Sequence, residues 1–387
     1  MIQLASDASA SLFEGAFRFA ARQLRALIER HPDFYPMYTA AGRWHHSGEA
    51  WTHWCDGFLP GMLWIVYARE THGSPESRWW REQAIRYSRP LEPRKVDRAV
   101  HDLGFLFMSS YYRWYGFTPD PTLKAVLVEA GRTMALRFQE KGRYLRSFLS
   151  PDSLFIDIMM NVGIVFYAAR ETGDRALLDV AVRHCHTTRR VLVRGDGSTA
   201  HEGLFDPETG EFLRQTTQQG YRGDSCWSRG LAWAFYGFGT AYSFARDPDF
   251  LATAEACADY YIRHTPADGV PPWDYSGADP LVRGRPPGRP VLPDTSAAAI
   301  AASGLFQLSG FLADSAKGHF YRETARHILA TLCRDWLAES DPAWEGILKG
   351  GVYHLHKNLG VNESVMWGDY FFLEALERYL SNRRLNE

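Results

Sequence analysis

Strongly apolar stretches recur along the chain, and each is opened by a short polar or glycine-containing segment. Their apolar residues follow helical spacing, whereas the alternation of period two that marks a half-buried strand is scarce. The pattern therefore predicts helices that are buried on all sides. There are six such stretches, at residues 55–68, 101–112, 156–169, 226–242, 294–308 and 367–380.

A second, more charged kind of helix is predicted between these stretches, for example at residues 121–138 and 175–192, where only one face is apolar. An amphipathic helix is also predicted at the start of the chain, ending at Pro32. The alternation predicts helical hairpins wound into a closed double ring, with the buried helices inside. An open all-α array is the alternative. Ring closure would bring the six polar segments to one end, where a functional site is expected.

Two segments rich in proline and glycine, residues 195–224 and 266–293, are predicted to be long loops on the ring. Neither resembles a linker between domains, because the helical hairpins continue in the same way on both sides. The chain is therefore predicted to form one catalytic domain over residues 1–387. Loops of this length in a compact domain are usually functional.

The composition is that of a globular protein with a large core: 45% of residues are hydrophobic and 23% are charged. The net charge of -2 favours neither a nucleic acid nor a membrane as partner. Five scattered cysteines without a CxxC pair indicate neither a disulfide framework nor a zinc site. With no secretory signal and no transmembrane stretch recognised, we expect a soluble, cytoplasmic protein.

Two aspartates lie in apolar surroundings at the heads of predicted buried helices. Asp157 stands alone in SLFIDIMMN and shares a helix face with Asn161, while Asp102 follows His101. Burial raises the pKa of a carboxyl group, and a pair of such groups suits general acid and base chemistry on a sugar. The alternative is that each aspartate caps its helix. Capping suits Asp102 better, because Ser153 is better placed to cap the helix of Asp157.

A third group of candidates lies in residues 198–238. Arg229 and Trp233 are four residues apart, so they project from the same face of one predicted helix. His201, Gln218 and Gln219 arrive from the preceding loop. A guanidinium group can pair with a carboxylate and an indole can cover a sugar ring, so the set suggests an acidic sugar. A structural salt bridge and a tryptophan packed in the core remain the alternative.

Aromatic residues make up 14% of the chain and include 13 tryptophans, which fits a packed helical core better than a carbohydrate-binding cleft. Trp44 could form a wall of such a cleft. Three further tryptophans compete for that role: Trp51, Trp54 and Trp64. His45 and His46 have no third ligand at useful spacing, so no metal site is predicted.

Seven motifs in this order resemble the unsaturated glucuronyl hydrolases of glycoside hydrolase family 88. They are GRW, WTHWCDGFLPGMLWIVY, HDLGFLFMSS, FIDIMMN, STAHEGLFDPETG, QGYRGDSCWSRGLAWAFYGF and GVNESVMWGDYFFLEAL, within residues 40–377. The resemblance implies an (α/α)6 barrel and an enzyme that removes a 4,5-unsaturated uronic acid from lyase-generated oligosaccharides. Such enzymes hydrate the C4=C5 double bond, and the resulting hemiketal opens and expels the rest of the saccharide. No metal or cofactor is implied.

The resemblance also implies roles for individual residues. Asp157 would be the general acid and base, kept protonated near neutral pH by its apolar surroundings, and Asp102 the second essential carboxylate. The residues expected to bind the unsaturated uronate are Trp44, His101, His201, Gln219, Arg229 and Trp233. Phe148 stands where the family has tryptophan, and HWC before Asp56 lengthens the first motif. Both departures bear on substrate preference more than on reaction type.

Other functions remain as alternatives. Unsaturated rhamnogalacturonyl hydrolases of family 105 share the fold and the chemistry, although HDLGF and IDIMMN favour family 88. An inverting glycosidase would use Asp102 and Asp157 on saturated sugars. A sugar epimerase would need a pair of histidine bases, and His201 has no evident partner. A scaffold protein would have no need of two buried carboxylates. The polysaccharide that supplies the substrate stays open.

Overall fold

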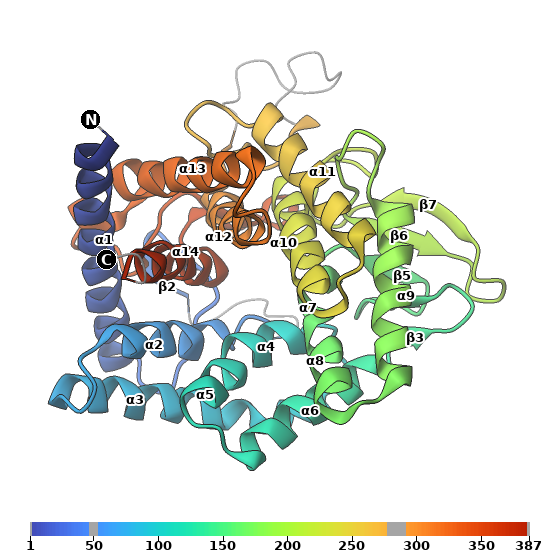
Figure 1. Ribbon diagram of the computed structural model, residues 1–387, viewed down its shortest axis with the longest axis horizontal. Coiled ribbons are helices and arrows are strands. Elements are labelled where there is room, and N and C mark those ends of the chain that lie inside the picture. The colour runs from blue at the N-terminus through green and yellow to red at the C-terminus, as the bar shows by residue number, and fades with distance from the viewer. Residues whose placement is uncertain (1, 46–52, 277–291, 385–387) are drawn as a thin grey trace.

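The helices of the computed structural model, which describes residues 2–45, 53–276 and 292–384, form a closed double ring (Figure 1). The inner ring contains α2 (Phe58–Arg69), α4 (Leu103–Ser109), α7 (Ile158–Asn161) with α8 (Gly163–Thr172), α10 (Ser228–Ala245), α12 (Thr295–Phe311) and α14 (Met366–Arg384). The outer ring contains α1 (Ile2–Arg30), α3 (Pro75–Ser88), α6 (Pro121–Ala135), α9 (Arg175–Leu192), α11 (Pro248–His264) and α13 (Ala316–Thr331). Helix α14 packs against α2 and closes the ring. The predicted all-α barrel of six helical hairpins is confirmed.

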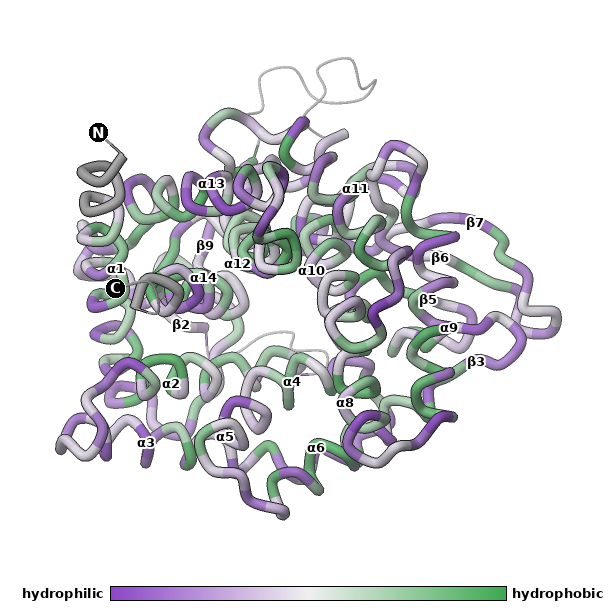
Figure 2. The backbone as a smooth tube through the Cα atoms, in the orientation of Figure 1, coloured by the Kyte–Doolittle hydropathy of each residue, from purple (hydrophilic) through white to green (hydrophobic). Residues whose placement is uncertain are grey.

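The two rings differ in burial as the sequence predicts. Every residue of α2 from Phe58 to Val66 is buried, and so is every residue of α12 from Thr295 to Phe306. Outer helices such as α9 bury one face only. Figure 2 shows this contrast as green inner helices and mixed outer ones. None of the helices in the described ranges combines the length and apolarity that spanning a bilayer requires.

Side-chain caps begin five outer helices and also the inner helix α12, where Asp294 accepts the Ser296 N–H. The outer helices α3, α6, α9, α11 and α13 each begin with a serine or aspartate whose side chain accepts a hydrogen bond from a backbone N–H of the first turn. Asp102 and Asp157 occupy the same position before α4 and α7, but neither side chain makes a capping hydrogen bond. The capping alternative for these two aspartates is therefore wrong, and their carboxylates stay available.

Strands are few and short in the described part of the chain. The largest sheet is antiparallel, in the order β5 (Ser153–Phe155), β6 (Glu202–Phe205), β7 (Phe212–Thr216). Two-stranded pairs are β1 (Thr39–Ala40) with β2 (Arg43–Trp44), β3 (Phe138–Gln139) with β4 (Tyr144–Leu145), and β8 (Gly351–His354) with β9 (Leu359–Glu363). The remaining elements are α5 (Tyr111–Phe117), the 3-10 helices η1 (Arg89–Val96), η4 (Ala338–Ser340) and η5 (Leu355–Lys357), and a π-helix, η3 (Leu332–Trp336).

The three-stranded sheet corrects one expectation and positions the site. The segment 195–224 was expected to be a loop, yet it contains β6 and β7, which pair as an antiparallel hairpin and add to β5. Of the other expected loop, residues 277–291 lie outside the described residues. Strand β5 leads directly into α7, and the Ile156 N–H donates to the His201 carbonyl at 2.9 Å. The sheet therefore places Asp157 and His201 side by side.

Candidate active site

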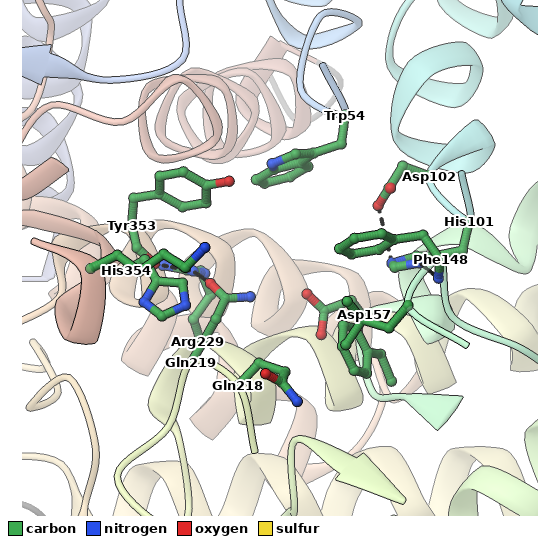
Figure 3. Close-up of a pocket in the computed structure, with 13 residues that line it drawn as sticks. Trp54, His101, Asp102, Phe148, Asp157, Gln218, Gln219, Arg229, Tyr353 and His354 are labelled. Atoms are coloured by element: carbon green, nitrogen blue, oxygen red, sulfur yellow. Dashed lines mark hydrogen bonds and ion pairs between the residues drawn. The ribbon is translucent and has the colours of Figure 1, made fainter. Parts of the chain in front are cut away.

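A pocket of about 400 Å³ lies at the end of the ring where α4, α7 and α10 begin (Figure 3). The polar segments that carry Asp102, Asp157 and Arg229 meet there, as the closed ring predicts. The pocket is lined by Trp54, His101, Asp102, Phe148, Leu149, Phe155, Asp157, Gln218, Gln219, Arg229, Tyr353, His354 and Lys357. Several aromatic rings therefore enclose a small number of polar groups, which is the usual make-up of a small-molecule site.

Asp157 combines access to the pocket with a low-dielectric environment. Its side chain is 14% exposed, and its Oδ2 lies 3.6 Å from Nε2 of His201. Burial raises the pKa of this carboxyl group to about 6, while the positive charge of Arg229 opposes the rise. Near neutral pH the group can therefore both hold and release a proton, as a general acid and base must.

Asp102 is the more deeply buried carboxylate, with 6% of its side chain exposed. Burial, and to a smaller extent the negative charge of Asp157, raise its pKa to about 8. The two carboxylates are thus electrostatically coupled, and Asp102 is the one that keeps its proton at pH 7. This order differs from the expectation that Asp157 stays protonated near neutral pH. The reason is Arg229, whose charge favours the ionised form of Asp157.

Two histidines each direct an N–H group at one of these carboxylates. Nδ1 of His101 accepts the Phe148 N–H at 3.0 Å, and Nδ1 of His201 accepts the Gln218 N–H at 3.0 Å. The proton of each neutral ring must therefore lie on Nε2, which faces Asp102 at 3.3 Å and Asp157 at 3.6 Å, respectively. Burial lowers the pKa of both rings, to about 3 for His201. Both histidines are neutral. His101 lies within reach of Asp102, whereas the 3.6 Å between His201 and Asp157 is too long for a hydrogen bond.

The sequence offers no evident histidine partner for His201, but the fold brings His101 near it, since the ring of Phe155 contacts both, with its centroid 5.7 Å from that of His101 and 4.6 Å from that of His201. The pair nevertheless does not suit an epimerase. An epimerase base needs an unprotonated nitrogen facing the sugar, whereas the ring nitrogens on the carboxylate side both carry hydrogen.

Arg229 lies behind the carboxylates and is 1% exposed. Its Nη2 donates to Oε1 of Gln219 at 2.5 Å and to the Tyr353 carbonyl at 2.9 Å, and its Nη1 donates to the Val352 carbonyl. Its terminal nitrogens are therefore engaged by the protein. Arg229 acts on an anionic ligand mainly through its charge, because a bidentate pair would have to displace one of these acceptors.

The glutamines of the loop before α10 complete the polar wall. Because Oε1 of Gln219 faces Arg229, the NH2 group of this amide is left to donate to a ligand. Gln218 is held from behind, since its Nε2 donates to Glu202 at 3.0 Å. Glu202 in turn accepts a hydrogen bond from Ser153 at 2.6 Å. These hydrogen bonds join a loop to strands β5 and β6 from distant parts of the chain, so the sequence pattern does not reveal them.

Three of the predicted binding residues do not line the pocket. One is His201, which lies beside Asp157 with 1% of its side chain exposed, and the others are Trp44 and Trp233. Trp44 is 4% exposed on β2, where its backbone N–H donates to Glu345, and Trp233 is packed between Phe105 and Phe371. Neither is among the described residues that line the pocket. A competitor of Trp44, Trp54, lines it instead, while Trp51 lies outside the described residues.

Several lining residues were missed by the sequence analysis. Tyr353 comes from strand β8, which follows no apolar head, and Phe155 ends strand β5. Phe148, noted as a departure from the family pattern, lines the pocket and stacks on His101 with ring centroids 5.5 Å apart. The only signal for these residues was their closeness in sequence to the motifs.

Within residues 2–45, 53–276 and 292–384, no three or more histidine, cysteine, aspartate or glutamate side chains are grouped so that they could hold a metal ion. The polar groups of the pocket are a carboxyl pair, neutral N–H donors and an arginine, which is a set that suits proton transfer next to an anionic sugar.

Comparisons with known proteins agree with the geometry. The family model for Glycosyl Hydrolase Family 88 matches residues 28–263. The unsaturated chondroitin disaccharide hydrolase of Streptococcus pyogenes serotype M1 is 31% identical over 85% of this chain and 81% of its own. The unsaturated glucuronyl hydrolase of Bacillus sp. (strain GL1) is 32% identical over 84% of this chain and 86% of its own.

Solved structures share the whole architecture. An unsaturated glucuronyl hydrolase specific for heparin superimposes with a TM-score of 0.85 at 29% identity, covering 97% of this chain and 98% of the other. The Bacillus sp. GL1 enzyme superimposes with a TM-score of 0.84 at 27% identity, covering 94% of this chain and 96% of the other. On its sequence and its fold, this chain is a glycoside hydrolase that belongs to glycosyl hydrolase family 88.

Proposed function

We propose that this enzyme releases a 4,5-unsaturated uronic acid from the non-reducing end of lyase-generated oligosaccharides by hydrating the C4=C5 double bond. The observation that carries the proposal is Asp157, a carboxyl group with a pKa raised to about 6 that opens into an aromatic pocket beside Arg229. Relatives support the substrate class: a solved structure of the Streptococcus agalactiae unsaturated glucuronyl hydrolase is a complex with dGlcA-GalNAc6S.

In this mechanism the Asp157 carboxylic acid donates its proton to C4, and positive charge develops at C5 and the ring oxygen. Water then forms a bond to C5 while the Asp157 carboxylate takes up one of its protons, so the acid form is restored. The product is a hemiketal at C5, which opens spontaneously and expels the remaining saccharide. Substrate and water are the only reactants consumed, and the aromatic walls keep the site apolar.

Asp102 and the histidines have supporting roles in the proposal. A protonated Asp102 adds no second negative charge to a pocket that must accept a uronate, and it can donate a hydrogen bond to a sugar hydroxyl. Nε2 of His201 lies 3.6 Å from Asp157, and its N–H group would favour the carboxylate that forms after proton transfer by approaching it. Gln219 offers its NH2 group, and Arg229 its charge, to the uronate carboxylate.

The function is tested by incubating the purified protein with a panel of unsaturated disaccharides generated by lyases from chondroitin, hyaluronan, heparin, gellan, xanthan and ulvan. We expect loss of the ultraviolet absorbance of the conjugated uronate, and the rank order of rates identifies the natural substrate. Saturated uronides serve as the comparison. Turnover of saturated uronides alone would contradict the proposal and favour a conventional inverting glycosidase.

The pH dependence should report the proton on Asp157. Because the acid form donates the proton, kcat/KM should be level below pH 6 and fall about tenfold per unit above the pKa of about 6. Bound uronate offsets the charge of Arg229 and raises the pKa of Asp157, so kcat should fall at a higher pH than kcat/KM. Initial rates measured across this range check both limbs. An increase in kcat/KM from pH 5 to 7 would mean that ionised Asp157 is the active form.

The tryptophan assignment can be tested with a pair of variants. Trp54→Ala removes an aromatic wall of the pocket and should raise KM several-fold to about tenfold, the value of one aromatic contact. Trp44→Phe changes a buried ring outside the pocket and should leave KM unchanged. Steady-state kinetics on the best substrate of the panel provides the measurement. The reverse pattern would return the stacking role to Trp44.

Two further expectations belong to the proposal. Residues 1–387 form one catalytic domain, which is supported by the packing of α1 against α2, α13 and α14 within the same ring.

The enzyme acts in the cytoplasm on its small oligosaccharide substrate, which is supported by five cysteines that are all free and buried. Limited proteolysis and cell fractionation test these points separately.

A further inference from the structure

Asp294 is a buried carboxylate one helix away from the pocket, and it is not among the described residues that line it. Its Oδ1 caps α12 by accepting the Ser296 N–H at 3.0 Å and the Ser296 hydroxyl at 2.6 Å. The same oxygen accepts the Val352 N–H of strand β8 at 3.3 Å. Oδ2 makes no hydrogen bond and points toward Nη1 of Arg229 at 3.6 Å. One oxygen therefore holds the backbone and the other faces the guanidinium.

Arg229 lies between two carboxylates. Asp294 and Asp157 both favour its charged form, and burial opposes that form. The guanidinium is also held between two indoles, with its carbon atom 4.4 Å from the ring of Trp227 and 5.0 Å from the ring of Trp367. These contacts and its hydrogen bonds position the guanidinium, so the charge that Asp157 experiences depends on how far Asp294 offsets it.

We propose that Asp294 is a positioning residue for the reaction: by holding Arg229 and offsetting its charge, it lets Arg229 attract the uronate without drawing the proton away from Asp157. The inference rests on the proposed function, because the proton concerned is the one delivered to C4. With Asp294 ionised, Arg229 and Asp294 form a nearly neutral pair in the free enzyme. Without that charge, Arg229 would favour ionised Asp157 more strongly.

The protonation states of the groups around Arg229 and Asp294 determine the net charge near Asp157. Arg229 also faces Tyr353, whose hydroxyl burial keeps neutral, and His201, whose ring burial keeps neutral. Asp157 faces Arg229 and His201, and it influences Asp102, which holds its proton up to a pKa of about 8. Asp294 additionally faces the neutral hydroxyl of Tyr261. Burial raises the pKa of Asp294, whereas the charge of Arg229 and the hydrogen bonds from Ser296 and Val352 oppose that rise and favour its ionised form.

The test is the pH profile of Asp294→Asn in the full-length enzyme. The alkaline limb of kcat/KM should move about one unit lower, the smaller end of the effect of an unshielded opposite charge. At pH 7 kcat/KM should then be about tenfold below the wild type, whereas at pH 5 the two enzymes should agree within about twofold. KM should not rise, because the charge of Arg229 is retained. A variant that had lost its structure would have low kcat/KM at every pH, so a return to the wild-type kcat/KM at pH 5 identifies a shifted pKa.

A matched control separates charge from packing. Ser296→Ala removes the 2.6 Å hydrogen bond to the same carboxylate but leaves its charge, so the thermal midpoint should fall and the pH limb should stay in place. Asp294→Ser is the second charge-removing variant, because serine caps a helix well and presents no amide N–H to Arg229. It should shift the limb as Asp294→Asn does.

A readout that needs no turnover keeps this inference separate from the proposed function. The carboxyl carbon of Asp157 can be titrated by 13C NMR in aspartate-labelled protein, with Asp157→Asn identifying its signal. We expect both Asp294 variants to lower that pKa by about one unit. An unchanged pKa, or an activity loss that is equal at every pH, would overturn the role of Asp294 even if the wild type hydrates unsaturated uronates. A shifted pKa in a protein without that activity would contradict only the proposed function.

Discussion

Asp157→Asn should reduce turnover of the unsaturated uronate by about 10³-fold or more while leaving the protein at least as stable at pH 7. An amide can neither protonate C4 nor accept a proton from water, and general acid and base catalysis contributes about 10² to 10⁴ in rate for each such transfer. The loss should appear in kcat rather than KM, because the pocket keeps its shape and the charge of Arg229. The rate is followed by the ultraviolet absorbance of the conjugated uronate.

The stability of this variant follows from the raised pKa. A carboxyl group whose pKa is 3.8 in the unfolded chain and about 6 in the fold destabilises the fold as pH rises through this range, by roughly 3 kcal/mol above it. The asparagine variant does not carry this cost, so its thermal midpoint should exceed that of the wild type at pH 7 and approach it below pH 4. Replacing a catalytic carboxylate lowers activity but raises stability, whereas replacing a structural carboxylate lowers stability.

Asp174→Asn is the matched control for Asp157→Asn. Asp174 caps α9 with hydrogen bonds to two backbone N–H groups, and asparagine caps equally well, so activity and thermal midpoint should both stay at the wild-type values. If Asp157→Asn kept most of its activity, or lost stability without losing turnover, Asp157 would not be the acid and base of this enzyme.

Gly104→Ala should have the second large effect, on stability and activity together. A Cβ at this position would lie 2.4 Å from the Cα and 2.6 Å from the carbonyl oxygen of Asn161, so the backbones of α4 and α7 would have to separate. Asn161 joins the two heads, since Oδ1 accepts the Phe105 N–H at 2.7 Å and Nδ2 donates to the Asp157 carbonyl at 3.1 Å. The contact therefore sets the spacing of the two aspartates that we propose as catalytic.

We expect Gly104→Ala to lose roughly 1–3 kcal/mol of unfolding free energy from overpacking. Displacing Asp157 by about 1 Å should also lower kcat/KM by about 10²-fold. Denaturant unfolding and steady-state kinetics measure the two effects. Gly310→Ala is the control, because Gly310 lies in α12 with no atom within 4 Å of its added Cβ. That variant should be as stable as the wild type or gain up to about 1 kcal/mol. Equal behaviour of the two variants would exclude a spacing role for Gly104.

The architecture could be predicted from the chain because it depends on a local property. Whether a helix is apolar all round or on one face is written in consecutive residues, and alternating the two kinds leaves a double ring as the compact solution. The candidate carboxylates were identifiable for the same reason. A lone carboxylate such as Asp157 in an apolar helix head must have a raised pKa wherever the helix packs.

Identifying which aromatic residues reach the ligand required the tertiary structure. Trp44 and Trp54 lie in the same tryptophan-rich stretch, yet β2 buries the first while the second lines the pocket. Trp233 shares a helix with Arg229, but the rings of Phe105 and Phe371 enclose it in the core. The direction of a side chain depends on neighbours from distant segments, and no local pattern contains them.

The chain by itself determined the barrel, the end of it that carries the site, and the two aspartates that make the chemistry possible. Only the tertiary structure determined which nitrogen of His101 and which of the two aspartates carries a proton. Nδ1 of His101 is occupied by a backbone N–H 47 residues away, and Asp157 is more acidic than Asp102 because Arg229 lies beside it. Protonation depends on distances between charges, and folding brings these charges together from segments far apart in sequence.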